Sequence, residues 1–150
     1  MPPYTTSLFP DINVWAVLTD EGHIHHPNAA EWFATLSPGA TLAFCRFTQL
    51  GLLRLLTAAA VMSDEVMTQP QAWAAYDRWL DDPRVELVDE PAELETRFRT
   101  MTRLRQPATK DWADSYLAAF AIAGQLTLVT FDRGLRSQAK SAILLHEKRR

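Results

Sequence analysis

The hydrophobic positions of this chain fall into short apolar runs separated by longer segments with helical patterning. The short runs predict strands at residues 7–9, 41–44, 85–88, 126–131 and 142–145, the last of them at a sheet edge. The longer segments predict helices at residues 11–18, 27–36, 49–56, 70–80, 91–102 and 111–123. Because strands and helices alternate, we expect an α/β fold with three layers, α/β/α, around a central, mainly parallel sheet.

The helix and strand between residues 111 and 134 form the centre of the expected fold. Residues 116–123 are too densely apolar for a solvent-facing helix, so this helix should pack on the sheet, and Gly124 ends it. The strand that follows is short and apolar, as in a buried parallel strand. Two further boundaries are expected: Thr48 as the N-cap of the helix at 49–56, and a loop at 61–68.

Composition and charge narrow the class of protein. The chain has 150 residues, 47% of them hydrophobic, which is enough for one domain, residues 1–150, with its own core. The lone Cys45 lies in an apolar run and is expected to be buried. No apolar run approaches membrane-spanning length, so we expect a cytoplasmic protein with no membrane partner. A net charge of −3 argues against binding nucleic acid by bulk electrostatics, although a nuclease with clustered carboxylates stays compatible.

Three aspartates occupy comparable places in this pattern. Asp11 follows the first strand, Asp132 follows the strand at 126–131, and Asp114 lies at the start of the helix at 111–123. The carboxyl ends of parallel strands share one sheet edge, so these acids should converge there. Their mutual repulsion calls for a cation, and oxygen ligands suit Mg²⁺ or Mn²⁺, which would activate a water against a phosphodiester. Taken singly, Asp114 is also a favourable helix-start acid and Asp132 a turn residue; their joint placement favours the site.

Other polar and aromatic residues carry weaker signals. His23, His25 and His26 suggest a metal cluster, but they lie in a polar segment without a fourth ligand, which favours a surface loop. Trp112 stands next to the expected site, whereas the other tryptophans are expected to be core or partner-facing. Arg54 is expected to pair with an acid near the site or on a partner. Three basic residues after Asp132 would contact RNA phosphate or remain solvated surface charge: they are Arg133, Arg136 and Lys140.

Four segments in the same order resemble the PIN-domain ribonucleases, and among them the VapC toxins of bacterial toxin–antitoxin pairs. The segments are LFPDINVWAVL, TQLGLLRLL, DSYLAAFA and TLVTFDRGL. The resemblance implies a compact α/β/α fold, cutting of RNA that depends on Mg²⁺ or Mn²⁺, and inhibition by a VapB-like antitoxin.

The resemblance also implies roles for individual residues. Asp11, Asp114 and Asp132 match the family's metal-site acids, and Asn13 and Thr130 match its polar supports. The family usually has a glutamate where this chain reads Thr-Gln-Leu-Gly at 48–51, and only Gln49 stands close to that place. A glutamine adds no charge, so metal binding would be weaker, or another acid would serve. Asp111, one helical turn before Asp114, is such a substitute or a plain helix-start acid, and the second reading is favoured.

The resulting hypothesis is a metal-dependent endoribonuclease that acts as the toxin of a VapBC-type pair. Apolar surface left on the helices at 27–36 and 49–56 would receive the antitoxin or a second copy in a homodimer. One rival is a phosphatase with Asp11 as aspartyl nucleophile, although such chemistry normally has a second acid two residues on, where Asn13 stands. The other rival is an interaction module that has kept the fold and lost the site, for which the missing acid at Gln49 is the warrant.

Overall fold

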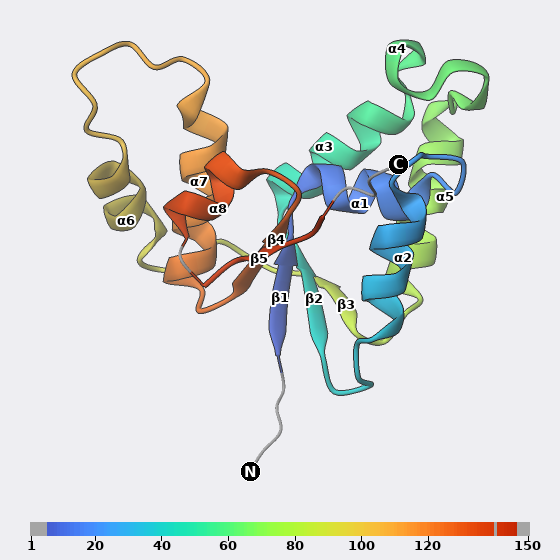
Figure 1. Ribbon diagram of the computed structural model, residues 1–150, viewed down its shortest axis with the longest axis horizontal. Helices are drawn as coiled ribbons and strands as arrows, with labels where there is room; N and C mark the ends of the chain where they lie inside the picture. The colour runs from blue at the N-terminus through green and yellow to red at the C-terminus, as the bar shows by residue number, and fades with distance from the viewer. Residues whose placement is uncertain (1–5, 140, 147–150) are drawn as a thin grey trace.

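The computed structural model describes residues 6–139 and 141–146, and within them five parallel strands form one sheet in the order β3-β2-β1-β4-β5 (Figure 1). The strands are β1 (Ser7–Pro10), β2 (Thr41–Phe44), β3 (Val85–Leu87), β4 (Thr127–Thr130) and β5 (Ile143–Leu144). Each hydrogen-bonded pair is parallel, and β5 lies at one edge. The expected parallel sheet and its C-terminal edge strand are confirmed.

Helices cover both faces of the sheet, which confirms the three-layer α/β/α fold. In Figure 1, α6, α7 and α8 lie on one side of the strands, and α1, α2, α3 and α5 lie on the other. The helices are α1 (Ile12–Thr19), α2 (His26–Ala34), α3 (Arg46–Leu56), α4 (Ala59–Met62), α5 (Gln69–Leu80), α6 (Leu94–Met101), α7 (Asp111–Ala123) and α8 (Arg133–Gln138), with a 3₁₀ turn, η1 (Ser63–Glu65), after α4.

Two apolar cores follow from the alternation of side chains along the strands. Leu8 of β1 faces the core under α1, α3 and α5, where Trp15 stacks on Phe44 with ring centroids 4.0 Å apart. The next residue, Phe9, faces the opposite core and stacks on Phe120 of α7 at 4.8 Å. The densely apolar helix at 111–123 therefore packs on the sheet as its composition predicts, and Gly124 is its C-cap.

Three boundaries differ from the sequence-based expectations. The expectation that Thr48 is an N-cap is wrong: α3 begins at Arg46, its N-cap is Cys45, and the Thr48 hydroxyl accepts a hydrogen bond from the Cys45 N–H at 3.0 Å. The loop expected at 61–68 contains the end of α4 and the η1 turn. Helix α8 was not expected, because its six residues are too few to show a helical period.

The structure also gives the burial of the lone cysteine and the length of the apolar helices. Cys45 is buried, as expected from its apolar neighbours. Among the residues described here, no helix has the length and apolar character needed to cross a membrane.

Candidate active site

Asp11 is fixed at the carboxyl end of β1 by bonds to two neighbouring elements. Its backbone N–H donates to the Val129 carbonyl of β4 at 2.9 Å, which extends the β1–β4 pairing by one residue. Its side chain caps α1, because Oδ1 accepts from the Val14 N–H at 3.1 Å. Asp11 is only 4% exposed. The carboxylate is therefore buried and held in one orientation at the sheet edge.

Thr130 links Asp11 to Asp132. The Thr130 side chain is fully buried at the end of β4, and its hydroxyl donates to Asp11 Oδ2 at 2.5 Å. The same hydroxyl oxygen accepts from the Asp132 N–H at 2.9 Å. Asp132 Oδ1 in turn accepts from the N–H groups of Gly134 and Leu135 and caps α8. One threonine thus positions two of the three candidate acids.

The three aspartates also share an electrostatic field. Burial is the main cause that raises the pKa of Asp11 from 3.8 to about 6, and the nearby charge of Asp132 adds to the rise against hydrogen bonds from Thr130 and two backbone N–H groups. The pKa of Asp114, in the first turn of α7, is raised by burial and then by the charges of Asp132 and Asp111. Asp132 is therefore the acid that acts on both of the others.

Gln49 does not lie in hydrogen-bond contact with these acids. Its buried side-chain oxygen Oε1 accepts from Arg46 Nη1 at 2.6 Å, one turn earlier on α3. Gly51 stands about 200° further round the helix and meets α1, where an added β-carbon would collide with the Ile12 side chain. The Gln49 amide is therefore engaged by Arg46 within α3, and the hydrogen bonds to the Asp11 carboxylate come from Val14 and Thr130.

Several of the remaining residues singled out from the sequence are exposed on the helices α1, α3, α7 and α8. Asn13 is exposed in the first turn of α1, and Arg54 is exposed in the last turn of α3 without an ion pair to any acid in the described part of the chain. Trp112 is 54% exposed and meets Phe98 edge to face. Arg133 is exposed at the start of α8, with Arg136 on the same helix, and Lys140 falls outside the described residues.

His23 and His25 lie in the turn before α2, and His26 is the first residue of that helix. The His25 N–H donates to His23 Nδ1 at 3.0 Å, and His26 Nδ1 contacts the Val17 carbonyl at 2.8 Å. His26 begins α2, with Pro27 in its first turn as expected. The loop reading agrees with the positions of His23 and His25, whereas His26 lies in a helix.

Comparison with known proteins assigns the chain to a family. A family model described as PIN domain matches residues 8–141. The chain belongs to the PIN-domain family. It is 43% identical to ribonuclease VapC41 of Mycobacterium tuberculosis, over 81% of this chain and 86% of that protein. It is 29% identical to ribonuclease VapC38 of the same organism, over 87% of this chain and 88% of the relative. The resemblance to VapC toxins is confirmed.

Solved structures show the same fold at lower identity. VapBC-1 from nontypeable Haemophilus influenzae aligns with a TM-score of 0.64 and 15% identity, covering 94% of this PIN domain and 98% of that chain. Mycobacterium tuberculosis VapC20, a sarcin-ricin loop cleaving toxin, aligns with a TM-score of 0.60 and 18% identity, covering 87% and 93% of the two chains.

The acids of this PIN domain carry carboxylate oxygens of the type that divalent cations take as ligands, but they do not form a closed cage. Within the described ranges, no three Asp, Glu, His or Cys side chains stand close enough together to hold a metal as they are. Magnesium, however, usually keeps several waters and binds one or two carboxylates together with substrate phosphate. Asp11 and Asp132 offer two such carboxylates, and the raised pKa of Asp11 shows a buried acid that a cation would stabilise as carboxylate.

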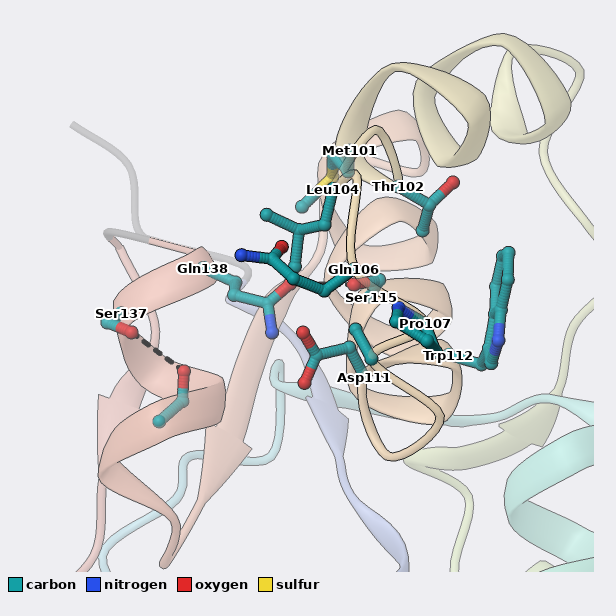
Figure 2. A pocket seen from close by; sticks show the side chains of 12 residues that line it. Met101, Thr102, Leu104, Gln106, Pro107, Asp111, Trp112, Ser115, Ser137 and Gln138 are labelled. Atoms are coloured by element: carbon teal, nitrogen blue, oxygen red, sulfur yellow. Dashed lines mark hydrogen bonds between the residues drawn. The ribbon is translucent and has the colours of Figure 1, made fainter.

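A pocket of about 380 Å³ lies between the α6–α7 connection, the start of α7 and α8, and its lining includes Ser115 and Gly134, one and two residues after Asp114 and Asp132 (Figure 2). Polar side chains line it from all three segments. These polar residues include Gln106, Asp111, Ser115 and Gln138, and the apolar wall includes Leu104 and Trp112. Sequence reasoning missed this pocket, since only Trp112 and Asp111 were singled out. The wall at 101–108 has no regular period, and α8 was not expected.

Proposed function

We propose that this PIN domain is the endoribonuclease toxin of a VapBC-type toxin–antitoxin pair, and that it requires Mg²⁺ or Mn²⁺ held by Asp11, Asp114 and Asp132. The observation that carries the metal site is the buried Asp11 carboxylate, positioned by Thr130 within the field of Asp132. Family membership and identity to a VapC ribonuclease support the activity on RNA.

The cation would supply charge neutralisation and Lewis acidity to water and to the phosphodiester. The chain itself supplies orientation. Thr130 sets the spacing between Asp11 and Asp132, and the Val14 N–H prevents the Asp11 carboxylate from turning. Hydrolysis between these acids would form one P–O bond from water while the P–O bond to the leaving sugar oxygen breaks, and the leaving oxygen takes up a proton.

Helix starts add to the attraction for phosphate. Asp11 caps α1, Asp132 caps α8, and Asp114 lies in the first turn of α7. The N-terminal end of a helix carries partial positive charge, which favours an anion such as a phosphodiester. We infer that these helix starts offset the negative charge of the aspartates when RNA approaches.

The partner is a VapB-like antitoxin, and we propose that it docks on apolar surface that α2 and α3 leave uncovered. Leu50 of α3 is 60% exposed, and Trp32 and Phe33 of α2 are only partly buried. A second copy of this chain competes for the same surface in the proposed homodimer. We further propose that residues 1–150 form one domain and that the toxin acts in the cytoplasm.

A cleavage assay tests the proposal. The purified protein should cut single-stranded RNA with Mg²⁺ or Mn²⁺, and EDTA should stop the cutting. Asp11→Asn and Asp114→Asn should each abolish it, whereas Asp64→Asn, the same charge change at an exposed acid of η1, should not. Unchanged cutting by both site variants would show that these aspartates do not form the site.

Two measurements separate the rival functions. The family match favours the ribonuclease over an aspartyl phosphatase, and hydrolysis of a simple aryl phosphate with no cutting of RNA would reverse that choice. An interaction module that has lost its site would bind no Mn²⁺ at millimolar concentration in calorimetry. The proposed toxin should bind Mn²⁺, and Asp11→Asn should weaken that binding.

A further inference from the structure

The pocket beside Asp114 has the size and the place of a subsite for part of the RNA. Its volume of about 380 Å³ lies in the range of pockets that enclose small ligands. Asp111 and Ser115 line it from positions on either side of Asp114 in α7, and Gly134, two residues after Asp132, lines it from α8. A group bound there would lie next to the phosphodiester that the acids act upon.

A hydrogen bond from Ser115 orients the side-chain amide of Gln138 in the pocket. The hydroxyl of Ser115, which is only 3% exposed, donates to Gln138 Oε1 at 3.0 Å. This bond occupies the amide oxygen of Gln138 and leaves its Nε2 hydrogens available to a ligand. Asp111 is exposed and contributes two acceptor oxygens. Figure 2 shows the side chains of Gln138, Asp111 and Gln106 reaching into the pocket from α8, α7 and the preceding loop.

This pattern selects among the four bases. The Watson–Crick edge of guanine presents two neighbouring N–H donors and one carbonyl acceptor, whereas adenine presents one donor and one acceptor, and an uncharged pyrimidine presents no pair of neighbouring donors. A carboxylate pairs with two neighbouring donors, and an amide N–H pairs with a carbonyl. We infer that the pocket binds an unpaired guanine next to the cleaved phosphodiester, with Asp111 accepting from its N1–H and N2–H and Gln138 donating to O6. The inference rests on the proposed ribonuclease function.

The apolar lining of the pocket suits a base whose sugar–phosphate backbone stays outside the pocket. Leu104, 62% exposed, and Trp112, 54% exposed, offer apolar surface to a base, as proteins that bind unpaired RNA do. Thr102, Leu104 and Gln106 line the pocket, while Arg103 and Arg105 between them are exposed on the same connection. Those two cations are placed to contact phosphates flanking the bound base.

The test maps where the protein cuts a library of unpaired RNA with a randomised segment, in Mn²⁺, by sequencing the products. The wild type should show guanine enriched about 10-fold or more at one fixed position beside the cut. Asp111→Asn should slow cutting at guanine, lose that enrichment and shift the remaining cuts toward adenine, because an amide offers one acceptor and one donor. Asp64→Asn removes the same charge from a distant exposed acid and should retain the guanine preference.

A second variant guards against a local defect in α7. Gln138→Met removes the donor to O6 while preserving side-chain length, and it should reduce the guanine enrichment among the cuts that remain. A guanine preference that both variants leave unchanged, or cutting by the wild type with no base preference, overturns the inference alone. Weaker antitoxin binding by Asp111→Asn with unchanged base preference also overturns it, because the pocket then belongs to the antitoxin. Absence of cutting by the wild type overturns the proposed function, and the inference with it.

Discussion

The burial of Asp11 predicts that the site costs the protein stability when no metal is bound. Asp11 has a pKa of about 6 in the folded chain, against 3.8 as its ordinary value. At about 1.4 kcal/mol for each pKa unit, holding this carboxylate ionised in the fold costs about 3 kcal/mol at a pH above both values. Asp11→Asn removes the charge and keeps the shape, so it should stabilise the metal-free protein near neutral pH.

The sign and the pH window follow from proton binding. Between pH 3.8 and about 6 the folded chain binds more protons at Asp11 than the unfolded chain does. Stability due to this group is therefore fully present below pH 3.8 and is lost as the pH rises through about 6. Between pH 4.5 and 7.5, about 2 kcal/mol of the total should be lost in the wild type and not in Asp11→Asn.

Urea unfolding in EDTA at several pH values measures this difference. The curve of unfolding free energy against pH should fall more steeply for the wild type than for Asp11→Asn, and the variant should be the more stable protein at pH 7.5. Mn²⁺ at 1,000 times the dissociation constant should reverse the order, because binding to the folded wild type then adds about 4.1 kcal/mol, which exceeds the cost of about 3 kcal/mol. Parallel pH curves for the two proteins in EDTA would refute the argument.

Three further predictions concern neighbouring positions. Asp132→Asn should abolish RNA cutting with a thermal midpoint near that of the wild type, whereas Asp132→Ala, which loses the cap of α8, should also cost about 1 kcal/mol in urea unfolding. Gly51→Ala should destabilise the wild type by about 1 kcal/mol or more through its collision with Ile12, and should become stabilising in an Ile12→Ala background, as a double-mutant cycle would show. Gln49→Glu should pair with Arg46 and leave Mn²⁺ affinity in calorimetry unchanged; a rise in affinity would return position 49 to the site.

The elements that could be predicted from the sequence are those whose pattern is local. The strands at 41–44 and 126–131 and the dense helix before Gly124 follow from apolar runs and a terminating glycine, and the structure has all of them. The start of α3 could not be predicted in this way. Its first turn is closed by a Cys45–Thr48 bond in which the threonine reaches back from inside the helix. A search for a threonine N-cap therefore placed the helix start three residues late.

The candidate site was predictable in part for a related reason. The position of Asp11 and Asp132 after parallel strands follows from the topology of the sheet. The two hydrogen bonds that link these residues to the Thr130 hydroxyl follow from the pairing of β1 with β4 that this topology requires. Side-chain direction on a helix was harder to predict. Gln49 is near the expected place in sequence, yet its side chain is held by a hydrogen bond from Arg46, which no spacing rule contains.

The capping role of the site acids has a consequence for how such a toxin gene can be inactivated. Asp11 and Asp132 each accept backbone hydrogen bonds at a helix start, a role in which asparagine serves about as well as aspartate. An Asp→Asn change at either position should thus abolish the toxic activity and leave an abundant, folded chain. Bacteria that survive overexpression of the toxin should carry such changes more often than frameshifts whenever selection also demands that the antitoxin still be bound. The fold makes harmless decoys of the toxin easy to reach by mutation.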